Sequence, residues 1–172
     1  MQKTTDNGTG PVRVAMDAMG GDHGPAETIK GALAAAKAVN AEIILVGDPD
    51  PVEQELARHD TTGITVRVVP SEDTIRDDEH PIQAMRTKPR SSVVVATKLV
   101  KTGDADVMVS MGSTGGSMAS AVLNLGLMKG LARPCLGGPF LGLAPNTVLV
   151  DIGSNLDCRP ELLLSFASMG VT

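Results

Sequence analysis

Aromatic residues are nearly absent from this sequence of 172 residues, which has no tryptophan, no tyrosine and two phenylalanines, Phe140 and Phe166. A hydrophobic core must therefore be built from aliphatic side chains and methionine, and apolar residues make up 42% of the chain. A chain of this length buries about 70% of the surface that it exposes when extended, so we expect one core.

Positive charge is also scarce, because 15 Lys and Arg stand against 20 Asp and Glu, giving a net charge of -5. Binding to a nucleic-acid backbone needs a clustered excess of cations, so we expect no nucleic-acid partner. No run approaches the roughly 18 apolar residues of a transmembrane helix, and the first ten residues lack the apolar segment of a secretion signal. These absences predict a cytoplasmic protein.

Several catalytic and metal-binding patterns are missing as well. The only cysteines, Cys135 and Cys158, have no metal-ligand spacing, so we interpret them as reduced, packed side chains and expect no metal. Neither GxGxxG nor a phosphate-binding P-loop is present, which disfavours the common nucleotide folds. There is no GxSxG motif, and His23, His59 and His80 accompany no evident nucleophile, so a covalent acyl-enzyme is not indicated.

Short β-branched runs alternate with segments of helical spacing along the chain. Strands are predicted at residues 12–18, 42–46, 64–69, 106–110 and 147–151, with a weaker one at 134–140. Helices are predicted from Pro25 onward and at residues 91–101, 113–128 and 160–169. This order predicts an α/β fold with a mostly parallel sheet covered by helices on both faces.

For domain organisation we expect a disordered tail over residues 1–10 and one α/β domain over residues 11–172. The helix predicted at 160–169 is apolar on most sides, so we expect it to be covered by further protein. Either a truncated chain or a large partner surface would provide that cover.

Three glycine-rich segments each follow a predicted strand and precede a helix: residues 17–25 (DAMGGDHGP), 109–116 (VSMGSTGG) and 151–158 (DIGSNLDC). Ligands of open α/β sheets collect at the carboxyl ends of the strands, and helix N-termini bind anions. Any one segment could be a simple turn. Three on one edge of a sheet predict an anion site, to which Ser113, Thr114 and Ser117 would add hydroxyl donors.

Charged residues outside these loops have two interpretations each. Adjacent Asp22 and His23 could be an acid/base or metal pair, or they could cap a helix or form local hydrogen bonds. The acidic run at residues 72–79 is most simply a solvated loop. The cluster of Arg86, Lys88 and Arg90 is either a solvent-facing turn or a docking site for an acidic partner or phosphate.

Three stretches carry a family resemblance: DAMGGDHGP at 17–25, PSEDTIRDDEHPIQAMRTKPRSSVVVATKLVKTGDADVMVSMGSTGG at 70–116, and VDIGSNLDCRPELLLSFASMG at 150–170. Over residues 12–170 the sequence resembles the PlsX-type phosphate acyltransferases. The resemblance implies a fold similar to isopropylmalate dehydrogenases and phosphotransacetylases. It also implies a homodimer of chains about twice this length, with the missing half carrying a surface for peripheral membrane association.

The chain departs from the usual motifs of that family at two places. Where the family commonly has S-A-G-N-T-G-A, residues 110–116 read SMGSTGG, so Met111 and Ser113 differ. Where the family has D-x-G-A-N-V-D, this chain has Ser154 and Leu156. Ser113 keeps a hydrogen-bonding group but has a shorter reach than asparagine.

The resemblance implies that inorganic phosphate attacks the acyl thioester of acyl carrier protein and forms an acyl phosphate for phospholipid synthesis, without a cofactor, a metal or a protein nucleophile. Two residues are candidate catalytic groups, His23 for proton transfer and Asn155 as a side-chain donor. Candidate phosphate and substrate contacts are Asp17, Gly20, Gly21, Asp22, Gly112, Ser113, Thr114, Gly115, Asp151 and Asp157. The cluster of Arg86, Lys88 and Arg90 would dock the carrier protein.

Two alternatives stay open from the sequence. One is a phosphotransacetylase-like enzyme that acts on a coenzyme A thioester. The other is a binding or dimerisation fragment without turnover, since these motifs supply one wall of a cleft.

Overall fold

The computed structural model describes residues 10–139, 141–152 and 157–171, so the tail predicted at 1–10 lies almost wholly outside the described residues. The chain divides into two compact units, Met1–Leu125 and Gly126–Thr172. The first unit contains β1 (Val12–Asp17), α1 (Ala26–Ala38), β2 (Ala41–Gly47), α2 (Pro49–Leu56), β3 (Val66–Pro70), α3 (Pro81–Thr87), α4 (Ser92–Thr102), β4 (Val107–Ser110) and α5 (Thr114–Leu125). The second contains β5 (Gly137–Gly138), β6 (Leu149–Val150) and α6 (Pro160–Gly170).

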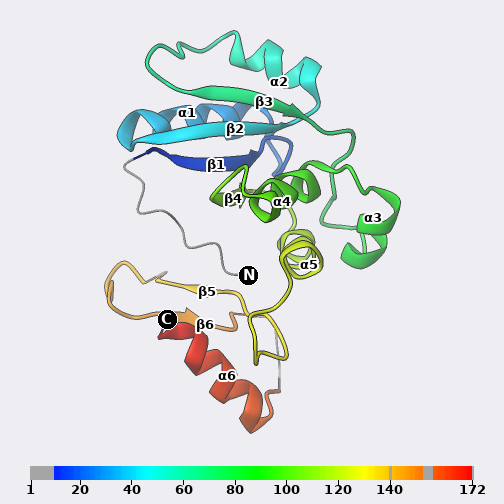
Figure 1. The fold of residues 1–172 in the computed structure, drawn as a ribbon, viewed down its shortest axis with the longest axis vertical. Helices are drawn as coiled ribbons and strands as arrows, with labels where there is room; N and C mark the ends of the chain where they lie inside the picture. Colours follow the sequence, from blue (N-terminus) through cyan, green and yellow to red (C-terminus); the bar gives the residue numbers. More distant parts are fainter. Residues whose placement is uncertain (1–9, 140, 153–156, 172) are drawn as a thin grey trace. The chain divides into compact units, whose positions relative to one another are not determined.

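A four-stranded sheet forms the centre of the first unit, with strand order β3-β2-β1-β4 (Figure 1). Every neighbouring pair in it is parallel, and Val14 of β1 lies between Ile43 of β2 and Val107 of β4. Parallel strands need crossover connections, which the intervening helices supply. The predicted α/β fold with a parallel sheet is confirmed.

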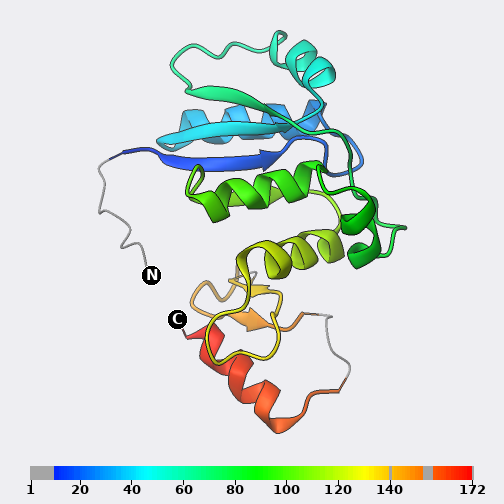
Figure 2. The ribbon, with the colours of Figure 1, turned by 45° about the vertical axis from the view of Figure 1, so that its right-hand side comes forward.

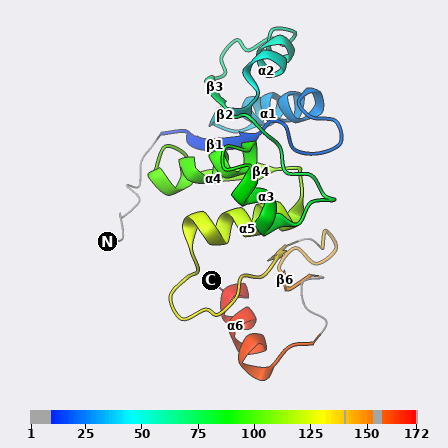
Figure 3. The ribbon, with the colours of Figure 1, turned by 90° about the vertical axis from the view of Figure 1, so that its right-hand side faces the viewer.

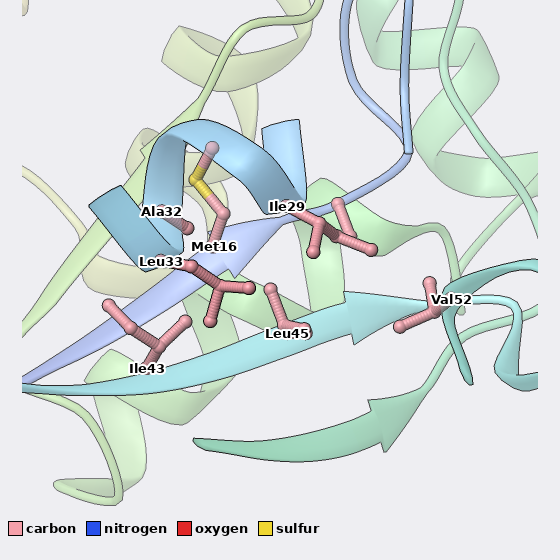
Figure 4. Close-up of a cluster of buried hydrophobic side chains, with 8 residues drawn as sticks. Met16, Ile29, Ala32, Leu33, Ile43, Leu45 and Val52 are labelled. Atoms are coloured by element: carbon pink, nitrogen blue, oxygen red, sulfur yellow. The ribbon is translucent and has the colours of Figure 1, made fainter. Parts of the chain in front are cut away.

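Helices cover both faces of this sheet, because successive side chains of a strand point to opposite sides. On one face, Met16 and Leu45 pack against Leu33 of α1, and Val52 of α2 joins the same cluster (Figure 4). On the other face, Ala15 and Ile44 pack against α4. Figure 3 shows α1 and α4 on opposite sides of the sheet.

Local polar contacts fix where the helices begin and end. The buried Thr28 hydroxyl lies 2.7 Å from the Ala18 carbonyl oxygen and 2.8 Å from that of Pro25, which ties the start of α1 to the end of β1. Asp48 caps α2 by accepting a hydrogen bond from the Asp50 amide. Gly103 ends α4 with a φ of 80°, a left-handed conformation that glycine adopts without strain.

Helix α5 lies beside α4, as Figure 2 shows, and also packs against α3. Its buried Ser120 hydroxyl donates to the Thr97 hydroxyl of α4 at 2.9 Å, and Thr97 donates to the Val93 carbonyl at 2.7 Å. Both hydroxyls are fully buried and satisfied. These contacts hold the middle of α5 against α4.

Helices α2 and α3 were not among the predicted elements. Each is short, at eight and seven residues, and each has a proline, Pro49 or Pro81, in its first turn. Proline there is compatible with a helix but indicates a turn equally well. So few residues give too little periodicity to distinguish the two.

Arg13 and Asp106 join the amino-terminal ends of β1 and β4. The guanidinium Nη2 of Arg13 lies 2.6 Å from Oδ1 of Asp106, and the Arg13 amide donates to Oδ2 at 2.8 Å. The hydrogen bond from the Arg13 side chain is the main cause that lowers the pKa of the Asp106 carboxyl. This contact sets the register of β4 at the edge of the sheet away from the glycine loops.

The second unit has a small antiparallel sheet, in which Gly137 of β5 pairs with Val150 of β6. The strand predicted at 147–151 was expected in the parallel sheet, and that expectation is wrong. Apolar alternation predicts a strand but does not identify its partner, and here the partner is the weak segment at 134–140. Helix α6 is confirmed, and it exposes Leu163 and Leu164. Within the described ranges, no helix is long and apolar enough to span a bilayer.

Candidate functional site

Two glycine-rich loops leave the carboxyl edge of the parallel sheet side by side. Asp17 and Ser110 are register partners at the ends of β1 and β4. The first loop, residues 18–25, leads into α1, and the second loop, residues 111–113, leads into α5. The prediction that these two glycine segments lie together at one edge is confirmed.

Asp17 connects the two loops through a chain of hydrogen bonds. Its carboxylate is 2% exposed and accepts from the Ser110 hydroxyl at 2.7 Å and from the Met19 amide at 3.2 Å. The Ser110 oxygen in turn accepts from the Gly112 amide at 3.1 Å. Sequence analysis did not single out Ser110, because only the pairing of β1 with β4 brings it opposite Asp17.

The loops cross backbone against backbone at Gly20 and Gly112. A Cβ added to Gly20 would lie 2.8 Å from the Gly112 nitrogen and 2.8 Å from Oδ2 of Asp17. One added to Gly112 would lie 3.3 Å from the Gly20 Cα. Next to this crossing, Gly21 has a φ of 86°, which disfavours any side chain. The glycines here are therefore required by close approach, not only by chain reversal.

Ser113 caps the N-terminus of α5, where its hydroxyl oxygen accepts from the Gly116 amide at 3.2 Å. A hydroxyl that accepts one hydrogen bond still has its own proton to donate. The first amides of a helix have no partner within it, so Thr114 and Gly115 supply two further donors at this end. Three donors are thus present at the N-terminus of α5, next to the second glycine loop.

Gly115 also lies at a close contact between α5 and α3, since a Cβ at this position would lie 2.9 Å from Cγ of Pro81. A bulky substitution there would push α5 away from α3. Gly115 is therefore unsuited to testing anion binding separately from folding, and Ser113 is the better position.

Asp22 and His23 are both exposed and lie in the first loop. The alternative that they cap α1 does not agree with the structure, because Pro25 is the N-cap residue and no side chain caps this helix. Both residues line one end of a groove of about 720 Å³. They are thus available to a ligand at the carboxyl edge of the sheet.

The third glycine segment, residues 151–158, follows β6 in the second unit and not a strand of the parallel sheet. The prediction of three loops on one sheet edge is therefore wrong for this segment. Asp151 has a φ of 60° and its carboxylate lies 3.4 Å from Sγ of Cys158. The pKa of the Cys158 thiol is raised, mainly because the thiol is partly desolvated and secondly because it contacts the Asp151 carboxylate. Asp157 is exposed, whereas Ser154, Asn155 and Leu156 lie outside the described residues.

The three residues of the basic cluster differ in their exposure and in their ion pairs. Lys88 is half-buried, and its Nζ lies 2.8 Å from Oε2 of Glu79 and 2.9 Å from the Thr74 carbonyl. Arg90 pairs with Glu72 at 2.8 Å, and both are exposed. Within the described part of the chain, Arg86 has no ion pair.

The acidic run is therefore not simply a solvated loop, since it holds Lys88 in place. Glu79 accepts from the Arg76 amide and from Lys88, and these two hydrogen bonds, the first the larger cause, lower the pKa of its carboxyl. Within the described ranges, no three His, Cys, Asp or Glu side chains lie close enough together to hold a metal ion.

Comparison with known proteins supports the resemblance seen in the sequence. The sequence profile of a family described as "Fatty acid synthesis protein" matches residues 12–172. Similar curated proteins, each named phosphate acyltransferase, come from Herpetosiphon aurantiacus (45% identity over 92% of this chain and 43% of the relative), Desulfitobacterium hafniense (46%, 92% and 47%) and Acaryochloris marina (47%, 92% and 46%).

This chain spans about half the length of those curated relatives. The profile match covers nearly all of it, both glycine loops included. The chain therefore belongs to the fatty acid synthesis protein family, together with proteins named phosphate acyltransferase.

Proposed function

We propose that the full product of this gene transfers an acyl group from acyl carrier protein to inorganic phosphate, as a step of phospholipid synthesis. The observation that carries the proposal is the meeting of the two glycine loops at the N-terminus of α5, where Ser113, Thr114 and Gly115 supply donors. Helix N-termini and small residues suit a phosphate, which needs both donors and room.

The chemistry requires no nucleophile from the protein. A phosphate oxygen forms a bond to the thioester carbonyl carbon, the carbon–sulfur bond breaks, and the released thiol takes up the proton that phosphate loses. Held amides would stabilise the oxyanion, each worth roughly 3 kcal/mol, and positioning of the two substrates would add several kcal/mol more. We assign the proton transfer to His23, which is exposed in the first glycine loop.

Within this proposal we give Asp17 a positioning role, because its buried carboxylate already accepts two hydrogen bonds and a second anion beside it would be repelled. The backbone of Gly20, Gly21 and Asp22 remains among the proposed substrate contacts, whereas the Gly112 amide already donates to the Ser110 hydroxyl and is given a positioning role. Asn155, Asp151 and Asp157 stay candidates from the sequence alone.

The family resemblance supports further parts of the proposal: a cytoplasmic homodimer, docking of acyl carrier protein at the basic cluster, and peripheral contact with a membrane. Residues 1–172 alone are expected to be inactive, since these loops supply one wall of a cleft. A phosphotransacetylase-like reaction with coenzyme A thioesters is the rival activity, and it would not need the exposed Arg86.

The first test is formation of acyl phosphate from palmitoyl acyl carrier protein and phosphate, trapped with hydroxylamine, by the full gene product. Ser113→Ala removes a hydroxyl donor worth roughly 1.5–3 kcal/mol to a charged ligand, so KM for phosphate should rise about 10- to 100-fold. Ser113→Asn should stay close to wild type, because asparagine is a good cap and has a longer donor. Faster turnover of palmitoyl coenzyme A than of the carrier-protein thioester would favour the rival activity.

The basic cluster allows a second test, in which Arg86→Glu is compared with Lys88→Glu. Arg86 is exposed and unpaired within the described residues, so its reversal should lower kcat/KM for the carrier-protein substrate about tenfold and leave a small thioester mimic unaffected. Lys88→Glu would break the contacts to Glu79 and Thr74 and should destabilise the protein. Equal losses on both substrates for Arg86→Glu would contradict a docking role.

A further inference from the structure

A groove of about 720 Å³ runs between α1 and β4 on the face of the sheet that α1 covers. Its floor is formed by Val14 and Met16 of β1 and Val109 of β4, and small residues of α1, Gly31 and Ala35, form its wall. One end lies at the first glycine loop. The other end lies at Val39 and Ala41, near the start of β1.

The polarity of the groove changes along its length. Its polar side chains are Asp22, His23, Glu27 and Thr28, all in or just after the first glycine loop. From Gly31 to Ile43, every residue that lines the groove is apolar or glycine. A ligand with one polar end and a long apolar remainder matches this distribution, with the polar end beside the proposed phosphate site.

The length of the groove also limits the ligand. It follows the six residues of β1, and a strand rises about 3.3 Å per residue, which gives about 20 Å. An extended alkyl chain advances roughly 1.25 Å per carbon, because single bonds of about 1.5 Å meet at tetrahedral angles. A chain of about sixteen carbons would therefore reach from the glycine loop to the far end.

A polypeptide helix is about 10–12 Å wide with its side chains, so it would place one face in the groove and lie partly outside it. The groove is nevertheless incompletely covered, since Val109 and Met111 are 38% and 66% exposed on the floor and rim. An alkyl chain would cover this surface without the width of a helix.

We propose that this groove binds the fatty acyl chain of the substrate, with its carbonyl end at Gly20–Gly24; the inference rests on the proposed acyl transfer. The groove thereby sets the preference for acyl length. Each methylene that moves from water into it contributes about a fourfold gain in affinity.

Gly31→Phe is the variant that tests this, because a Cβ at Gly31 meets no atom within 4 Å and a phenyl ring would extend into the groove. Replacing a helical glycine also favours helix formation, so the protein should stay folded. Ala34→Phe adds the same ring to an exposed position of α1 outside the groove and serves as the control.

In the full gene product, Gly31→Phe should lower kcat/KM for palmitoyl thioester about 100-fold, the loss of three to four methylenes at about fourfold each. Octanoyl thioester should lose far less, so the preference for long chains disappears. Ala34→Phe should keep the wild-type preference. If Gly31→Phe also keeps the wild-type preference for palmitoyl over octanoyl thioester, the groove does not hold the acyl chain, even if the overall rate has changed.

Binding gives a readout that does not depend on turnover. Residues 1–172 should bind a fluorescent long-chain fatty acid that palmitate displaces, and Gly31→Phe should abolish this binding while Ala34→Phe retains it. If the fatty acid binds in this pattern but the full gene product forms no acyl phosphate, the proposed function is overturned and the assignment of the groove stands. A lower melting temperature of Gly31→Phe in the full product, with residues 1–172 unaffected, would show that protein fills the groove and would overturn the inference.

Discussion

Replacing Asp17 by alanine is expected to lower the free energy of unfolding by about 3 kcal/mol, a large part of the 5–15 kcal/mol typical of a domain. The variant removes an acceptor that is 2% exposed and leaves the Ser110 hydroxyl and the Met19 amide without their partner. Hydrogen bonds to a charged group contribute roughly 1.5–3 kcal/mol each. The measurement is urea unfolding followed by circular dichroism, since the chain has no tryptophan.

Two further variants interpret that result. Asp17→Asn keeps an oxygen for the Met19 amide but gives up the carboxylate that the Ser110 hydroxyl donates to, so about half of the loss is expected. Asp22→Ala removes an exposed carboxylate from the same loop and should unfold like wild type. Unfolding of Asp17→Ala at the wild-type urea concentration would mean that this hydrogen-bonded chain does not hold the two loops together.

Gly20→Ala is expected to separate the loops and to lower the rate of acyl phosphate formation by the full gene product about 100-fold. Its methyl group would lie 2.8 Å from the Gly112 nitrogen, a backbone atom, and 2.8 Å from the Asp17 carboxylate, which its hydrogen bonds to Ser110 and Met19 hold in place. Overpacking of this kind costs typically 1–3 kcal/mol, and a displacement of about 1 Å at a reacting centre can cost about 100-fold in rate.

The matched control is Gly31→Ala, the same chemical change in open space on α1. It should raise the free energy of unfolding by about 0.5–1 kcal/mol, because alanine is the better helix former. The free energy of unfolding should therefore fall for Gly20→Ala and rise for Gly31→Ala, and this difference in sign is the informative comparison. Wild-type kinetics for Gly20→Ala would show that the crossing has room to relax.

Periodicity along the sequence was sufficient to predict the parallel sheet and the two adjacent glycine loops. The β-branched runs around β1, β2 and β4 are separated by helical spacing, and this order leaves few topologies for a buried sheet. The loops could be placed at one edge because carboxyl ends of parallel strands lie on the same side. That argument fails for residues 151–158, since β6 pairs with β5 in an antiparallel sheet.

Other features depend on contacts that no local pattern contains. The partnership of Asp17 with Ser110 follows from the register of β1 and β4, 93 residues apart in sequence. Pairing of Lys88 with Glu79 depends on how the segment before α3 folds back. The groove exists because α1 covers β1 and β2 but not β4, and the width of a helix relative to a sheet is not visible in residue spacing.

The position of β4 at the end of the strand order has a consequence for handling the protein. No strand of the described residues pairs with its outer edge, and Val107 and Val109 are exposed on the face that α1 leaves open. An unpaired edge beside apolar side chains is a template for strands of other molecules. Concentrated solutions of residues 1–172 should therefore self-associate through β4, and a lysine at Val107 would be the mildest way to prevent it.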